Sequence, residues 1–144
     1  MPHLGVSRVL PFRSEQLFDL VADVERYPQF LPGWISARIL RREGDVYDTD
    51  QVIGLGPIRQ RFRSRTVLRR PDAIEVAALD GPFDAFQLSW RFEPLPPARC
   101  RLALAGELAL RGPLRHVLGR LMAGGFEPVL AAFAERARRL HGAS

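Results

Sequence analysis

The sequence contains no lysine, and arginine supplies all 21 of its basic residues. Against 16 acidic residues, these leave a formal net charge of +5. Together with frequent alanine, glycine and proline, this composition is typical of a GC-rich bacterial genome. Such a bias weakens any interpretation of each arginine as a selected phosphate contact, and we expect no sequence-specific DNA binding.

Cysteine and long apolar runs are also scarce. The single cysteine, Cys100, excludes an internal disulfide framework, fits a reducing cytoplasm and is predicted to be an inert core residue. No apolar run approaches the roughly 20 residues that span a bilayer. The first residues, MPHLGVSRVLPF, lack the basic and apolar regions of a secretory signal. We therefore expect a cytoplasmic protein, with any membrane association confined to the inner face.

The sequence lacks the motifs of metal, phosphate and nucleophile chemistry. His3, His116 and His141 are scattered and make no metal-ligand spacing with the one cysteine. The glycines of GLGPIRQRF (residues 54–62) are not followed by Gly-Lys-Ser/Thr, so this segment predicts a hairpin turn. No nucleophile elbow and no histidine–aspartate pairing with a serine is visible. We predict no catalytic residue, no metal site and no covalent cofactor.

The length of 144 residues predicts one domain, residues 1–144, with a single sizeable core. Residues 3–10 are predicted to form a strand. A helix is predicted over residues 15–24, with Ser14 as its N-cap, because apolar residues recur there at helical spacing. Pro28 and Pro32 prevent that helix from continuing, so a short second helix and a turn are expected next.

From Ile35 to Leu110 the apolar residues recur with a period of two. The clearest strand is FQLSWRFE (residues 86–93), and the same alternation occurs in residues 73–80 and 99–110. Short turn segments separate these strands. The pattern indicates an antiparallel sheet with one covered face.

A long helix is predicted from about Pro113 to Leu140, because an apolar stripe runs along it. Pro128 would remove the bond to the carbonyl of Gly124, so a kink or break is expected between Gly124 and Pro128. The element order is strand, short helices, antiparallel strands and terminal helix. It predicts an α+β fold in which a curved sheet grips the last helix.

Several phrases carry a family resemblance across nearly the whole chain. They are VLPF (residues 9–12), QLFDLVADVERYPQFLP (16–32), GPF (81–83), WRF (90–92) and FAERARRL (133–140). With them, the chain resembles the coenzyme-Q-binding branch of the START-like, helix-grip superfamily, which is related to the polyketide cyclases and dehydrases. That branch also includes the bacterial ribosome-association toxins of the RatA type. The resemblance implies a seven-stranded antiparallel sheet around the C-terminal helix, two short helices after the first strand, and a hydrophobic cavity.

The cavity implied by the resemblance is predicted to hold an isoprenoid quinone or a similar lipid. Its predicted walls are Phe62, Phe86, Leu88, Trp90 and Phe92 from the sheet, with Met122, Phe126, Val129 and Phe133 from the helix. Its predicted mouth is Tyr27, Phe30, Leu31, Pro32 and Trp34. Tyr27 or Trp34 is expected to donate a hydrogen bond to a head group. The alternative is that these aromatic residues only fill one end of the core.

Four arginines recur at every second position of one predicted strand: Arg59, Arg61, Arg63 and Arg65. Adjacent like charges repel, so this row is expected to face solvent, balanced across strands by Glu75 and Glu93. The functional alternative is a stripe that contacts RNA or an anionic membrane. Because no aromatic residues are interleaved, RNA contact would be made to phosphates.

Ionisable residues are scarce among the predicted inward positions. Asp50, Asp80 and Tyr27 are the only ones expected near a cavity, and a cyclase or dehydratase needs a positioned acid or base. Three functions stay open. The first is non-catalytic binding of a hydrophobic molecule, by resemblance an isoprenoid quinone (ubiquinone), in support of respiratory quinone function. The second is docking on the large ribosomal subunit to limit translation. The third is an enzyme of the aromatic cyclase type.

Overall fold

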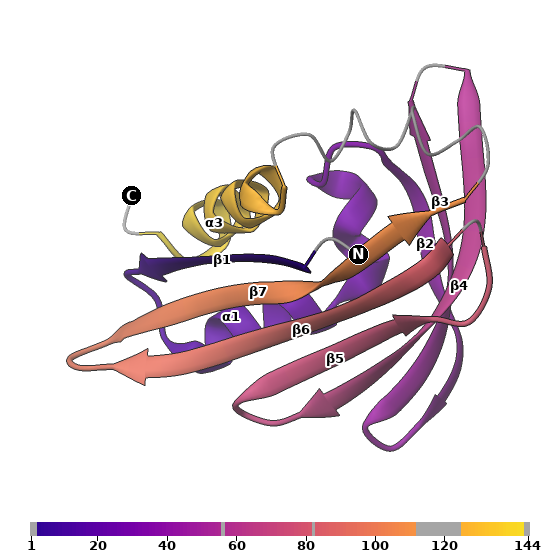
Figure 1. Ribbon diagram of the computed structural model, residues 1–144. Coiled ribbons are helices and arrows are strands. Elements are labelled where there is room, and N and C mark those ends of the chain that lie inside the picture. The colour runs from indigo at the N-terminus through magenta and orange to yellow at the C-terminus, as the bar shows by residue number, and fades with distance from the viewer. Residues whose placement is uncertain (1–2, 56, 82, 112–124, 143–144) are drawn as a thin grey trace.

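A computed structural model describes residues 3–55, 57–81, 83–111 and 125–142 (Figure 1). In chain order, its elements are β1 (His3–Leu10), α1 (Ser14–Ala22), the 3-10 helix η1 (Val24–Gln29), β2 (Trp34–Glu43), β3 (Val46–Leu55), β4 (Ile58–Arg69), β5 (Ala73–Ala78), β6 (Phe83–Leu95), β7 (Arg99–Leu110) and α3 (Glu127–His141). The predicted order of elements is therefore confirmed.

The seven strands form one antiparallel sheet in the order β1-β7-β6-β5-β4-β3-β2. Strands β2 to β6 each pair with the next strand along the chain, and β1 pairs with β7. The sheet bends so that β2, β3 and β4 rise at an angle to β6, β7 and β1, and α1 and α3 lie within the bend (Figure 1). The predicted helix-grip arrangement is confirmed.

The alternation of the strands explains which face of the sheet is covered. In β6, Trp90 and Phe92 are buried while Arg91 between them is exposed, and in β7 Cys100, Leu102 and Leu104 are buried. On α3, the buried residues recur at spacings of three and four: Leu130, Phe133, Ala134 and Ala137. Both stripes meet in one core, because a helix and a sheet each bury one apolar face.

Helix α1 begins one residue earlier than expected. Its N-cap is Arg13, so Ser14 is the first helical residue and the predicted Ser14 cap is wrong. The Gln16 side chain caps this end instead, because its Oε1 accepts a hydrogen bond from the Arg13 N–H at 3.0 Å. The short second helix is confirmed as η1, which contains Pro28.

The interruption expected between Gly124 and Pro128 is confirmed for its described residues. Gly125, with φ of +66°, and Phe126 form a turn, and α3 begins at Glu127. Pro128 thus lies in the first turn of a helix, where the missing N–H costs no hydrogen bond. The upstream part of the predicted helix, residues 113–124, lies outside the described residues, as does the predicted wall residue Met122.

Candidate functional site

An apolar cavity of about 150 Å³ lies between the inner face of the sheet, the segment after η1 and the start of α3. Its lining comprises Tyr27, Leu31, Pro32, Gly33, Trp34, Gln51, Ile53, Phe62, Val76, Phe83, Phe86, Leu88, Trp90, Leu104, Leu108, Phe126, Pro128, Val129 and Phe133. Nearly all of these side chains are hydrophobic, as is usual for sites that hold small apolar ligands.

Most of the predicted wall and mouth residues line this cavity. They are Tyr27, Leu31, Pro32, Trp34, Phe62, Phe86, Leu88, Trp90, Phe126, Val129 and Phe133. Phe92 does not, although it lies on the same face of β6, because Phe18 of α1 packs on it with ring centroids 5.2 Å apart. Phe30 does not either: its ring packs on Phe133 at 5.1 Å and under the Arg136 guanidinium at 5.2 Å.

Aromatic contacts hold the walls in place at both ends of the cavity. Phe62, Phe83 and Phe86 touch one another, with centroid distances of 4.8 to 5.6 Å. At the other end, the Phe133 ring lies 4.9 Å from Trp90 and 5.4 Å from Tyr27, both edge to face. Since edge-to-face pairs are favourable, these contacts fix the positions of rings that line the cavity.

Sequence reasoning missed several lining residues: Gly33, Gln51, Ile53, Val76, Phe83, Leu104, Leu108 and Pro128. Val76, Leu104 and Leu108 share the apolar face already visible in their strands, so that alternation could have found them. Gln51 and Ile53 lie on β3, whose sequence VYDTDQVIGL is polar on both faces along much of its length. The one local signal is that the charged residues Asp48 and Asp50 fall on the face opposite Gln51 and Ile53.

The polar side of the cavity is built around Gln51, which is only 6% exposed. Its Oε1 accepts a hydrogen bond from Trp34 Nε1 at 2.8 Å. Its Nε2 donates to Thr49 Oγ1 at 2.9 Å and to Ser64 Oγ at 3.2 Å. The two hydroxyls are 2.6 Å apart and fully buried. This network satisfies a polar cluster inside an otherwise apolar sheet face.

Tyr27 or Trp34 was expected to donate to a ligand head group, but in the structure both donors already have partners inside the protein. The Tyr27 hydroxyl donates to the backbone carbonyl of Val21, and the Trp34 N–H donates to Gln51 Oε1. Burial raises the pKa of Tyr27 well above its ordinary value of 10.0, helped by Tyr47 and Asp23. Tyr27 therefore stays neutral, and its hydroxyl remains a hydrogen-bond donor to the Val21 carbonyl.

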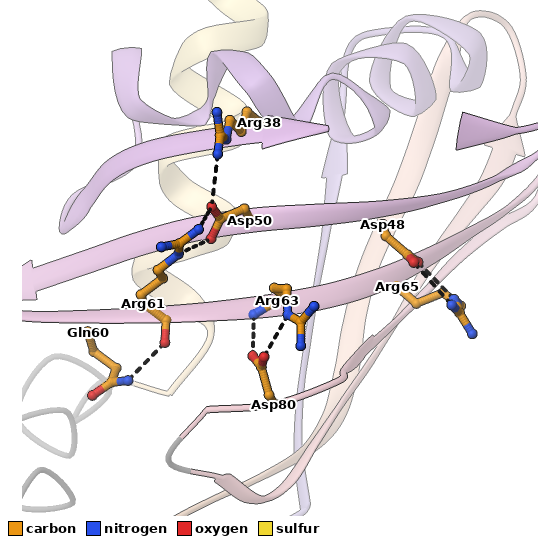
Figure 2. Close-up of polar contacts among 8 residues, drawn as sticks. All are labelled: Arg38, Asp48, Asp50, Gln60, Arg61, Arg63, Arg65 and Asp80. Carbon is orange, nitrogen blue, oxygen red and sulfur yellow. Dashed lines mark hydrogen bonds and ion pairs between the residues drawn. The ribbon is translucent and has the colours of Figure 1, made fainter. Parts of the chain in front are cut away.

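Asp50 and Asp80 were expected near the cavity, and both predictions are wrong. Because successive strand residues point to opposite faces, Asp50 lies on the outer face of β3 while Gln51 points inward. Asp50 accepts from Arg61 Nε at 2.7 Å, and Arg38 lies 3.6 Å away (Figure 2). Asp80 likewise meets Arg63 on that face, at 2.7 Å.

The arginine row of β4 (Arg59, Arg61, Arg63 and Arg65) faces solvent, as predicted. The expected balance by Glu75 and Glu93 is wrong, because Glu75 accepts from Ser89 and Glu93 pairs with Arg101. Three aspartates balance the row instead, from β3 and the segment after β5: Asp48, Asp50 and Asp80 (Figure 2). Hydrogen bonds from the arginines hold the pKa of all three carboxyls below the ordinary value of 3.8.

The described residues hold no obvious centre for other chemistry. Within ranges 3–55, 57–81, 83–111 and 125–142, no three His, Cys, Asp or Glu side chains come together as metal ligands. The Cys100 thiol is buried, and its burial raises its pKa. In that same part of the chain, no helix is long and apolar enough to cross a membrane.

Comparison with known proteins gives a consistent assignment. The family described as "Polyketide cyclase / dehydrase and lipid transport" matches residues 10–135. The ribosome association toxin RatA of Pseudomonas aeruginosa is 33% identical over 97% of this chain and 98% of its own length. The mitochondrial coenzyme Q-binding protein COQ10 homolog B of Xenopus laevis is 26% identical over 94% of this chain and 58% of its own.

The solved structures support the fold. A START superfamily protein from Mycobacterium smegmatis superimposes with a TM-score of 0.82, covering 96% of this chain and 98% of that one. At 18% identity, this likeness concerns the fold alone. The predicted START-like resemblance is confirmed.

Proposed function

Since this chain belongs to the polyketide cyclase / dehydrase and lipid transport family, we propose that its cavity binds a hydrophobic small molecule, an isoprenoid quinone, without converting it chemically. The observation that carries the proposal is the almost wholly apolar lining of the cavity. Burying apolar surface contributes about 25 cal/mol per Å² to the binding free energy, so such a wall favours a hydrophobic ligand over a polar one. The similarity to a coenzyme Q-binding relative supports the same ligand class.

The cavity volume limits which part of such a molecule is enclosed. A volume of about 150 Å³ is comparable to that of an engineered apolar cavity that takes up one benzene ring. The enclosed part would therefore be the quinone ring or the end of an isoprenoid chain, with the remainder outside. An isoprenoid quinone meets this requirement because its ring and its chain units are each of this size.

The ionisable groups around the cavity favour binding over catalysis. Tyr27 is the one ionisable residue among those that the structure shows in the lining. Its hydroxyl already donates to Val21, and its raised pKa makes it a poor acid or base near neutrality. An aromatic cyclase would need a positioned acid or base here, so the cyclase alternative has less support.

The test compares quinone binding by the wild type and by Phe126→Asp, which places a charge in the wall. Binding of a short-chain ubiquinone should fall at least about tenfold, because the carboxylate would have to be desolvated against an apolar ligand. Leu40→Asp is the matched control, since Leu40 is 46% exposed on β2 and does not line the cavity. Circular dichroism shows whether each variant is folded, and solvent extraction of purified protein shows whether it carries a quinone.

A second variant keeps the wall apolar but fills the space. Val129→Trp adds an indole from the first turns of α3, at a half-buried position in the lining. Loss of binding in this variant would assign the ligand to the cavity. If the folded Phe126→Asp and Val129→Trp proteins both bind ubiquinone like the wild type, the proposal is wrong.

The similarity to RatA favours a second candidate function, association with the large ribosomal subunit. Its candidate interface is the arginine row of β4, which faces solvent. Contact with RNA phosphates would weaken as the salt concentration rises. Sedimentation with purified large subunits at increasing salt tests this, and failure to co-sediment at low salt would exclude it.

A further inference from the structure

The hydrogen-bond donors of the side chains around the cavity are already used inside the protein. Trp34 Nε1 donates to Gln51, and the Tyr27 hydroxyl donates to Val21. The two N–H bonds of the Gln51 amide point to Thr49 and Ser64, at 2.9 and 3.2 Å. Among the described residues that line this cavity, a ligand therefore meets no free side-chain donor.

The orientation of the Gln51 amide follows from its partner. An indole N–H can only donate, so the atom of Gln51 that faces Trp34 must be the oxygen. A carbonyl oxygen has two lone pairs, and Trp34 occupies one of them. Gln51 lines the cavity and is 6% exposed. Among the described residues, Trp34 alone donates to its Oε1, so the second lone pair of that oxygen can accept from a ligand.

The other polar groups of the lining point to the same chemistry. The Tyr27 hydroxyl already donates its hydrogen bond to the Val21 carbonyl, so its oxygen can only accept from a ligand. The carbonyl of Gly33 accepts a hydrogen bond from Gly54 N–H at 2.8 Å. Thr49 and Ser64 are fully buried behind Gln51 and do not line the cavity.

We infer that the cavity selects a ligand whose polar end is a hydroxyl donor, so that it binds the reduced hydroquinone in preference to the quinone. This inference rests on the proposed function, because it specifies the ligand of the same cavity. A quinone carbonyl facing Gln51 Oε1 would place two acceptors together and leave both unsatisfied. The hydroxyl of a hydroquinone donates to that oxygen, and its ring contacts the same apolar wall.

The first test uses the unmodified protein and two ligands of nearly the same shape. Equilibrium dialysis under nitrogen compares a pentyl-substituted 1,4-hydroquinone with the corresponding 1,4-benzoquinone. We expect the hydroquinone to bind about fivefold tighter than the quinone. The hydroquinone gains one hydrogen bond, whereas the quinone leaves an acceptor without a donor, and a net difference of one hydrogen bond corresponds to about this ratio. Cys100, the one thiol of the chain, is fully buried, which protects it from addition to the quinone.

The outcomes separate this inference from the proposed function. If neither ligand binds, the proposal that the cavity takes a quinone fails, and the inference fails with it. If both bind with equal affinity, or the quinone binds tighter, the apolar cavity stands as the site but the inference is overturned. A preference for the quinone would mean that a backbone N–H, such as one at the start of α3, meets the polar end.

The second test changes the acceptor itself. Gln51→Met keeps the length of the side chain, removes its oxygen and leaves the Trp34 N–H as an unpaired donor at the cavity. The affinity ratio of hydroquinone to quinone should fall to one or below, since a free donor favours the quinone carbonyl. Gln60→Met is the matched control, because the Gln60 amide donates a hydrogen bond to the Arg61 carbonyl and does not line the cavity. An unchanged ratio in folded Gln51→Met protein would overturn the assignment to Gln51.

Discussion

At the scale of single residues, Asp50 shows how a charge is held on the outer face of the sheet. Its side chain is 8% exposed and lies between Arg61 and Arg38. The hydrogen bond from Arg61, followed by the charges of both arginines, holds its pKa below 3.8. A carboxyl whose pKa is lower in the folded state stabilises the fold fully above its unfolded pKa. That stability is lost as the pH falls through the folded pKa.

Replacing this carboxylate should therefore have a pH-dependent effect. We expect Asp50→Asn to lower the free energy of unfolding by about 1 kcal/mol at neutral pH, a value kept small because both arginines are largely exposed. Urea unfolding should show the difference from wild type shrinking as the pH falls below the ordinary aspartate pKa of 3.8 and the wild-type carboxyl becomes protonated. Asp84→Asn, which removes an exposed partner of Arg111, should change little at either pH. A deficit for Asp50→Asn that stays constant as the pH is lowered through the acidic range would contradict this cause.

At the scale of elements, the pairing of β6 with β7 depends on a glycine. Gly106 lies opposite Leu88, whose side chain lines the cavity. A Cβ at position 106 would lie 2.1 Å from the Gln87 carbonyl oxygen and 3.0 Å from Leu88 Cα. Both are backbone atoms, so the strands would have to separate to make room for it.

Gly106→Ala should accordingly destabilise the sheet. We expect a loss of about 2 kcal/mol or more, because backbone cannot move aside as a flexible side chain does. Gly5→Ala in β1 is the matched control, since the nearest atom to its added Cβ is Ala105 Cβ at an ordinary 3.8 Å. Thermal unfolding compares the midpoint temperatures of Gly106→Ala and Gly5→Ala. Equal midpoints would show that the strands relax at little cost.

The strands were predictable from the sequence because alternation is a local property. The faces of β6 and β7 and the exposure of the arginine row on β4 follow from alternation alone. The partners of those arginines do not, since the contact of Asp48 with Arg65 depends on the register between β3 and β4. No residue pattern within either strand specifies that register.

The limits of the cavity were not predictable for a related reason. Phe92 and Trp90 share one face of β6, yet only Trp90 lines the cavity, because α1 places Phe18 over Phe92. Where an apolar face is covered and where it stays open depends on the helix packed against it. Gln51 was missed because a polar side chain is not expected on a covered sheet face, although the charged residues Asp48 and Asp50 lie on the opposite face of β3.

At the scale of the whole molecule, the two proposed functions use opposite faces of one sheet. The cavity residues of β4, such as Phe62, point toward the helices, while the arginines that alternate with them point to solvent. A charge change on the outer face should therefore leave the cavity unchanged. The same separation predicts that a cavity variant leaves any ribosome contact intact.

Charge reversal on the outer face tests this independence. We expect Arg59→Glu combined with Arg63→Glu to reduce co-sedimentation with large ribosomal subunits by about tenfold or more at low salt, because phosphate contacts become repulsive. Ubiquinone binding by that variant should match the wild type, and Phe126→Asp should show the reverse pattern. Arg138→Glu, which changes an exposed arginine on α3, serves as the charge control.

The salt dependence of wild-type co-sedimentation should be shallow for a row of four arginines, since Asp48, Asp50 and Asp80 already neutralise three of them. If the outer-face variant also loses ubiquinone while remaining folded, the two faces are coupled and the separation fails.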